Sequence, residues 1–191
     1  MIAYQTDLDI IIFRKQYRKY IQSYDPTGSV WIGDTCYKFR METLFNGRLR
    51  VYLPEQFADM PDSSAKVKYP SRNRPSIIKT NENATVDFTF SFIGENQFRL
   101  TAQTVWNEIE YYFPRNVLYD TGTFTKENQE IFWLEYKSFS MESEVYNLLF
   151  TIVFGNTDTK STILGAFNCA FASYDIWKPC VLQIIEAIQC E

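Results

Sequence analysis

The side chains best suited to binding chemistry lie between residues 65 and 80. This stretch carries basic residues and no Asp or Glu, and Pro70 and Pro75 restrict its backbone. A rigid basic loop can hold guanidinium and ammonium groups against carboxylates or phosphate. Alternatively, these cations are solvated, or are neutralised by the acidic second half of the same chain. The candidate partner-binding residues are Lys66, Lys68, Arg72, Arg74 and Lys79.

Catalytic chemistry finds little support in the residue content. The 191 residues include no histidine, which removes the commonest general base and metal ligand near neutral pH. The glycines are dispersed and match no phosphate loop or dinucleotide fingerprint. The acidic pairs within 7–9, 108–110 and 142–144 have a spacing of two, which points helical side chains to different faces. We therefore assign no catalytic, cofactor-binding or metal-binding residue and expect no cofactor.

Cysteine usage and hydropathy bear on the compartment and the partners. The chain has four cysteines without C-x-x-C spacing, and we interpret them as reduced thiols. No apolar stretch approaches the roughly 20 residues of a membrane helix, and no basic segment followed by an apolar one opens the chain. The net charge of −4 argues against nucleic-acid binding. We expect a cytoplasmic protein that binds another protein and neither nucleic acid nor a membrane.

One hairpin is predicted before the basic stretch, around residues 46–47, and a second one at its end, over residues 77–92. Asn46-Gly47 lies between two apolar stretches and predicts a two-residue type I′ turn, because both residues tolerate positive φ. The second strand of this hairpin ends in the corner Leu53-Pro54-x-x-Phe57, which we expect to be buried. A short helix bracketed by prolines follows in 60–70. In residues 85–92 apolar and polar residues alternate, which predicts a strand with one buried and one exposed face.

The rest of the chain predicts one long helix, a meander and a closing helix. Apolar residues at helical spacing, from Phe98 to Tyr112, predict a helix over 95–113 that ends before Pro114. Residues 1–28 are an N-terminal extension, and 29–191 form a single domain with one continuous antiparallel sheet. The remaining expected elements are strands at 117–124, 129–139, 145–154 and 159–169, and a helix at 174–189 with Trp177, Val181, Ile184 and Ile188 on its apolar face.

Three motifs resemble the PsbP-like superfamily. The turn at 44–47, with the corner at 53–57, resembles its opening strand pair. Two further stretches, 69–75 and 165–169 followed by 177–179, resemble segments of an uncharacterised bacterial branch of this superfamily, which also includes DcrB-like and Eag-type bacterial proteins. The resemblance implies an α+β fold in which an antiparallel β-sheet is flanked by helices in an α/β/α sandwich. It also implies non-enzymatic partner binding, and it carries over no active site.

These observations favour a non-enzymatic protein-interaction module, an adaptor or a chaperone. The alternative is a small-ligand-binding protein or an enzyme that uses a carboxylate/Arg pair in an aromatic-lined pocket. A deep cavity with paired carboxylates would favour the alternative. A flat apolar patch or an exposed sheet edge would favour the interaction module.

Replacing Arg72 and Arg74 together with Ala tests the basic loop. We expect the fold to be retained, because exposed charges usually change stability by less than ~0.5 kcal/mol. Capture of an acidic partner should fall and become less sensitive to salt, since exposed charge pairs are screened over ~8 Å at physiological ionic strength. Equal recovery of the same partners by both proteins, in low and high salt, would show that the loop is merely solvated.

Overall fold

The computed structural model describes residues 24–71, 74–95, 102–139, 143–156 and 159–191. These residues form two antiparallel sheets and three α-helices, so the predicted antiparallel α+β fold is confirmed. The smaller sheet has the strand order β1-β2-β3-β11. Its strands are β1 (Ser29–Ile32), β2 (Thr35–Leu44), β3 (Leu49–Pro54) and β11 (Gln189–Cys190).

The larger sheet has seven strands in the order β4-β5-β6-β10-β9-β8-β7. Strands β7 to β10 form the predicted meander, in which each strand pairs with the next. The strands are β4 (Ala58–Asp59), β5 (Ile77–Thr80), β6 (Asp87–Glu95), β7 (Val117–Lys126), β8 (Gln129–Phe139), β9 (Glu144–Gly155) and β10 (Lys160–Ala170).

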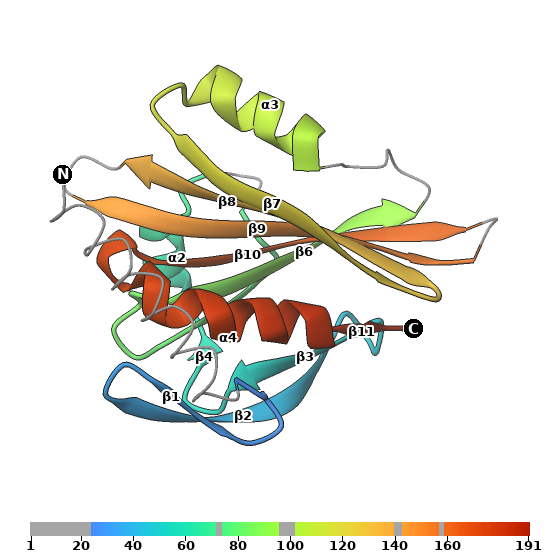
Figure 1. The fold of residues 1–191 in the computed structure, drawn as a ribbon, viewed down its shortest axis with the longest axis horizontal. Helices are drawn as coiled ribbons and strands as arrows, with labels where there is room; N and C mark the ends of the chain where they lie inside the picture. The colour runs from blue at the N-terminus through green and yellow to red at the C-terminus, as the bar shows by residue number, and fades with distance from the viewer. Residues whose placement is uncertain (1–23, 72–73, 96–101, 140–142, 157–158) are drawn as a thin grey trace, which may run out of the picture.

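Helices cover the large sheet on both sides. Figure 1 shows α3 on one side and α4 on the other, between the large and the small sheet. The helices are α2 (Asp62–Lys68), α3 (Ala102–Tyr112) and α4 (Tyr174–Ala187), and a 3₁₀ turn, η1 (Phe171–Ser173), leads into α4. The predicted helix at 95–113 begins later than expected, because residue 95 ends β6; residues 96–101, with Phe98, lie outside the described residues.

The prediction of one continuous sheet is wrong. The opening hairpin pairs with β11, beyond the end of α4, and makes a separate sheet. The reason lies in α4, whose buried residues extend over more than one side of the helix. Cys180 and its neighbour Val181 are both buried, and so are the neighbours Ile184 and Ile185. A helix that is apolar on two sides needs two layers to cover it.

The turn of the opening hairpin also differs from the prediction. Leu44 pairs with Leu49, so the connection spans residues 45–48 and is not a two-residue turn. Phe45 and Asn46 have φ of 53° and 56°, and the Arg48 N–H donates to the Phe45 carbonyl at 3.3 Å. The Phe45 ring packs on Phe92 of β6 with centroids 6.1 Å apart, so a contact between the sheets accompanies the unusual backbone.

The corner after β3 is buried as predicted, whereas β6 is not half exposed. Leu53 is 0% and Phe57 2% exposed. On the face of β6 predicted to be exposed, Asp87 is 0% and Thr89 4% exposed. Asp87 is covered because the end of α2 and the residue after it, Tyr69, contact its carboxylate.

Trp177→Ala tests the packing of α4. The indole is 4% exposed, and its ring lies 5.1 Å from Tyr37, 6.2 Å from Phe57 and 5.5 Å from Phe167. Truncation should lower the free energy of unfolding by ~3–5 kcal/mol in denaturant titration, because it leaves a cavity between the sheets. The control Trp31→Ala, at a position 57% exposed, should cost much less. Equal losses in both variants would contradict the assignment of Trp177 to the core.

Candidate protein-interaction surface

The structure does not bring the five predicted basic residues together as one free surface. Arg72 lies outside the described residues. Lys66 is exposed on α2, and Arg74 is half-buried in the loop before β5. Lys68 and Lys79 are ion-paired within the chain. Their partners lie in the first hundred residues and not in the acidic second half.

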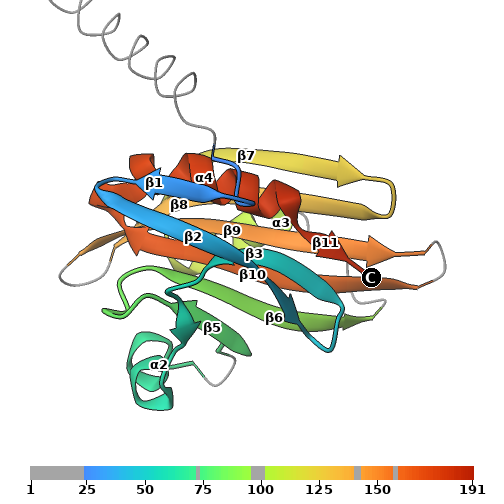
Figure 2. The same ribbon diagram turned by 90° about the horizontal axis from the view of Figure 1, so that it is seen from below.

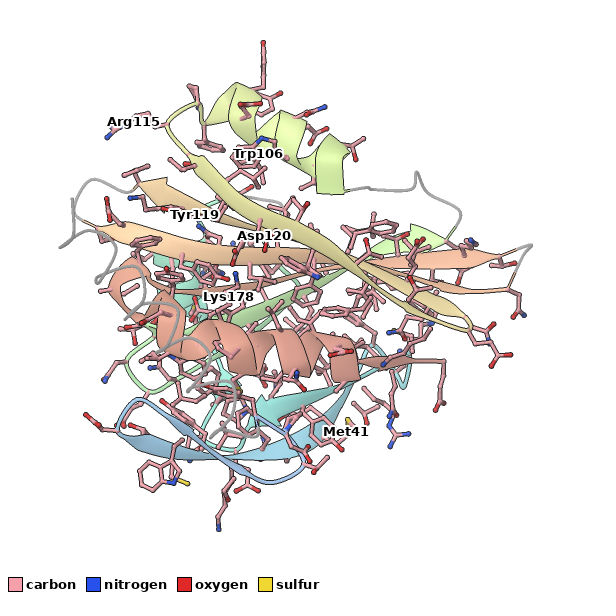
Figure 3. The ribbon with its side chains drawn as sticks, viewed as in Figure 1. Met41, Trp106, Arg115, Tyr119, Asp120 and Lys178 are labelled. Atoms are coloured by element: carbon pink, nitrogen blue, oxygen red, sulfur yellow. The ribbon has the colours of Figure 1, made fainter. Side chains whose placement is uncertain are left out.

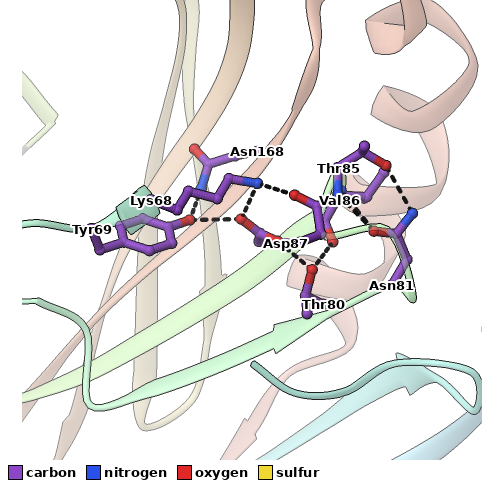
Figure 4. Close-up of polar contacts among 9 residues, drawn as sticks. Lys68, Tyr69, Thr80, Asn81, Thr85, Val86, Asp87 and Asn168 are labelled. Carbon is purple, nitrogen blue, oxygen red and sulfur yellow. Dashed lines mark hydrogen bonds and ion pairs between the residues drawn. The ribbon is translucent and has the colours of Figure 1, made fainter. Parts of the chain in front are cut away.

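Lys68 belongs to a cluster around a fully buried carboxylate (Figure 4). Its Nζ lies 2.6 Å from Asp87 Oδ2, to which the Tyr69 hydroxyl donates at 2.8 Å. The Thr80 hydroxyl donates to Asp87 Oδ1 at 2.5 Å, and Asn168 Nδ2 donates to the Tyr69 oxygen at 3.2 Å. Burial, followed by the Asp87 charge, raises the pKa of Tyr69 far above its usual value. The cluster therefore fixes the end of α2 to β5, β6 and β10, which is a structural role.

Lys79 joins the two sheets. From β5 its Nζ lies 3.0 Å from Glu42 Oε2 on β2 and 3.0 Å from Asp59 Oδ1 on β4. Arg40 Nη2 lies 2.6 Å from Glu42 Oε1. Burial alone would raise the pKa of Glu42, but hydrogen bonds from Arg40 and Lys79 outweigh it, and the pKa is lowered.

A surface that sequence reasoning missed lies between α3 and β7. Large apolar side chains follow one another there, with exposed fractions from 37% to 80%. Figure 3 labels Arg115 and Tyr119 at this end of the large sheet, with Trp106 between α3 and the sheet. We call this surface the aromatic patch; it consists of Tyr111, Tyr112, Phe113, Val117, Leu118 and Tyr119.

The aromatic patch continues toward α4 as a stack of rings. The Tyr119 ring stacks on Phe171 with centroids 5.8 Å apart, and Phe171 stacks on Tyr174 at 4.9 Å. Lys137 Nζ lies 4.7 Å from the Phe171 centroid, a cation–π contact. Arg115 makes a similar contact with Phe139 at 5.3 Å. Aromatic rings with neighbouring cations match the composition typical of protein interfaces.

Tyr112 is the last residue of the apolar spacing that predicts the long helix, and it is also the last residue of α3. Its side chain is 70% exposed. Trp106, one and a half turns earlier, is the buried anchor of α3 and lies 5.9 Å from Tyr136. The signal available in the sequence was the run Tyr111-Tyr112-Phe113 before Pro114, which places apolar side chains all around the end of the helix.

Beside the aromatic patch, β7 forms an edge of the large sheet. All of its ten residues except Tyr119 pair with β8 on one side, and in the described part of the chain no strand pairs with the other side. Figure 2 shows β7 along this edge, at the opposite end of the sheet from β5 and α2. The pairing is interrupted by one register shift, between Leu118 and Asp120, and is regular from Asp120 to Lys126.

A shallow hollow lies between α3 and the large sheet, and it has no enclosed space for even a water molecule, whereas typical ligand pockets enclose ~300–1,000 Å³. Its lining contains no carboxylate and no arginine: Val105, Phe132, Leu134, Leu149, Phe150 and Thr151. Among the residues that the structure describes, no group of His, Cys, Asp or Glu could hold a metal ion. Nor does any described helix have the length and apolar character to cross a membrane.

Solved structures with the same fold identify the architecture as the Mog1/PsbP-like fold. LpqN of Mycobacterium tuberculosis, described as involved in cell envelope biogenesis, is 10% identical with a TM-score of 0.54; the match covers 83% of this chain and 93% of LpqN. The Ran-binding protein Mog1p of Saccharomyces cerevisiae is 8% identical with a TM-score of 0.51, covering 81% of this chain and 96% of Mog1p. No protein-family model and no curated protein matches the sequence.

Glu42→Gln tests the ion pairs between the sheets. Because the folded-state pKa of Glu42 lies below its ordinary value of 4.5, the charged carboxylate stabilises the fold above that pH, and this contribution is lost as pH falls through the lowered pKa. The variant should lose about 1 kcal/mol of unfolding free energy at pH 7, after allowance for solvent screening. Its difference from the wild type should shrink below pH 4.5. The ion-pair role would be contradicted if the loss of unfolding free energy did not depend on pH, or if the exposed control Glu55→Gln lost as much.

Proposed function

We propose that this chain is a non-enzymatic protein-interaction module, an adaptor or chaperone, that contacts its partner through the aromatic patch and the adjacent edge of β7. One observation carries the proposal: exposed aromatic and aliphatic side chains adjoin a strand edge with no pairing strand in the described part of the chain. Large exposed apolar patches are rare on monomeric soluble proteins and usually mark interaction sites. Unpaired strand edges are likewise sites where another chain can add.

The fold is compatible with this role. Mog1p, which has the same fold, is described as a Ran-binding protein. A fold does not determine function, so the residues of the aromatic patch, and not the likeness, support a contact surface in this chain. The alternative of an enzyme or small-ligand protein gains no support from the hollow under α3, because its lining lacks the carboxylate/Arg pair that the alternative requires.

The basic stretch is proposed as a second contact, for an acidic region of the partner. Lys66 and Arg74 are the described residues whose cations can face a partner, and Arg72 belongs to the same loop. Lys68 and Lys79 contribute by positioning α2 and β5, since their ammonium groups pair with Asp87, Glu42 and Asp59.

We also propose a cytoplasmic location. All four cysteines are free thiols, which suits a reducing compartment. Cys180 is fully buried, and burial raises the pKa of its thiol to about 12, so this residue is a packing residue and not a reactive one. Assignment to an uncharacterised bacterial branch of the superfamily that also includes DcrB-like and Eag-type proteins is a further proposal, which rests on the sequence motifs at 69–75, 165–169 and 177–179.

The test is affinity capture with a triple variant of the aromatic patch, Tyr112→Ser, Phe113→Ser and Tyr119→Ser, followed by mass spectrometry. Recovery of the wild-type partner should fall at least about tenfold, because aromatic hot-spot residues each contribute ~2 kcal/mol or more to binding. The melting temperature should stay close to that of the wild type, since these side chains are at least half exposed.

The matched control is Trp31→Ser, which removes an exposed aromatic ring from the small sheet. It should leave partner recovery unchanged. Equal recovery of the same partners by the wild type and the triple variant would overturn the assignment of the aromatic patch as the contact surface.

A further inference from the structure

We propose that β7 binds an extended segment of the partner protein as an added strand of the large sheet, with a side chain of the segment accepting a hydrogen bond from the Trp133 indole. This inference rests on the proposed function and names the binding mode and the chemistry of the bound segment. Three observations carry it: the direction of the β7 backbone groups, the close approach of the Trp133 indole to Gly122, and the Trp133 donor without an acceptor among the described residues.

Alternate residues of β7 direct their backbone groups away from β8. Lys126 and Gln129 flank a two-residue hairpin loop, so the backbone N–H and C=O groups of Lys126 point toward β8. Hydrogen-bonded positions alternate along a strand, so the backbone groups of Phe124 and Gly122 point toward β8 as well. The residues between them face outward. The Thr121 N–H confirms this direction, because it donates to the Asp120 side chain at 2.9 Å and not to β8. Thr123 and Thr125 therefore present their N–H and C=O groups at the outer edge.

The outer edge of β7 lacks most of the features that protect edge strands from strand addition, such as prolines, central lysines and central bulges. No proline occurs in β7, and its one lysine, Lys126, is its last residue. The register shift lies at the start of the strand, before Asp120, and leaves the later residues in regular pairing. The Asp120 carboxylate occupies a single outward N–H, that of Thr121, which leaves the edge from Thr123 onward open to an incoming strand.

Gly122 lets the Trp133 indole lie against the β7 backbone, next to the position that a side chain of the incoming strand would take. A Cβ at this position would lie 2.4 Å from Trp133 Cζ2 and 2.8 Å from Trp133 Nε1, so the indole runs directly beneath the glycine backbone. Because Gly122 faces β8, the residue opposite it on an added strand falls in a non-hydrogen-bonded pair, where side chains approach most closely. Glycine in a strand is typical of such close approach.

Trp133 supplies an unused donor beside Gly122. The residue is 9% exposed, and its Nε1 is buried without a hydrogen-bond acceptor among the described residues. Buried indole N–H groups usually find a partner. Nε1 is closed to solvent in the unbound chain, so the added strand must shift the indole slightly before a short oxygen-bearing side chain opposite Gly122, from Ser, Thr, Asn or Asp, provides the acceptor. The bound segment therefore combines such a residue with an apolar residue that reaches Tyr119 in the aromatic patch.

The experiment selects random twelve-residue peptides, displayed on phage, against the immobilised full chain. Selected peptides are synthesised with a fluorescent label and titrated by polarisation. Thr123→Pro should weaken binding at least about tenfold, because it removes an outward N–H while leaving the pairing with β8 intact. The control Thr123→Ala keeps the N–H and should bind within about twofold of the wild type. Unchanged affinity for Thr123→Pro would overturn strand addition.

Two further measurements do not depend on the proline variant. Hydrogen exchange of the wild type should slow at the amides of Thr123 and Thr125 when peptide is bound, and no slowing there would contradict the proposal. Trp133→Phe should weaken peptides that carry the oxygen-bearing residue by about threefold to tenfold, and their valine analogues by less. Equal weakening of both peptides would overturn the role of the indole donor.

The outcomes also separate this inference from the proposed function. If the triple variant of the aromatic patch loses peptide binding and Thr123→Pro retains it, the contact surface stands and strand addition is wrong. If neither variant loses binding, both are wrong. If sedimentation shows a wild-type dimer that Thr123→Pro dissociates, the occupant of the edge is a second copy of this chain, and a partner segment is excluded.

Discussion

The burial of α4 between two sheets is the constraint on which the rest of the structure depends. Its apolar residues contact the small sheet on one side and the large sheet on the other, and Trp177 meets rings from both. An ion pair with a buried carboxylate adds to this packing: Lys178 Nζ, on a partly exposed side chain, lies 2.6 Å from Glu135 Oε1, and the Tyr146 hydroxyl donates to Glu135 Oε2 at 2.7 Å. The opening hairpin exists as a separate sheet because the second apolar side of α4 must be covered.

This arrangement determines where a partner can bind. The α4 face of the large sheet is filled by the core, and the β5 end is occupied by α2 and the Asp87 cluster. The opposite end is different, because α3 stops at Tyr112 and covers the sheet mainly through Trp106. The aromatic patch and the edge of β7 are therefore neighbours because of the topology: both lie at the β7 end of the sheet, where no further strand pairs in the described part of the chain.

Much of the fold could be predicted from the sequence, because its signals are local. The meander boundaries follow from alternating residues, and the closing helix follows from the spacing of Trp177, Val181 and Ile184. The separate small sheet could not be predicted, since it depends on the pairing of Arg50 with Gln189, which are far apart in the sequence. The burial of Asp87 was missed for the same reason: its polarity indicates exposure, and only the tertiary contact with Lys68 explains its position.

The candidate site was harder to predict than the fold, because charge and apolar character are ambiguous outside their context. Lys79 and Arg74 look equivalent in the sequence, yet one joins two sheets and the other lies in a loop. Tyr112 fits a helical stripe, but the helix ends where the sheet no longer covers it. Gly122 and Trp133 are unremarkable as single letters, and only the pairing register places an indole donor beneath a glycine at a free edge. A binding site made from backbone groups and one buried donor leaves no motif in a sequence, which is why the basic stretch attracted the first interpretation.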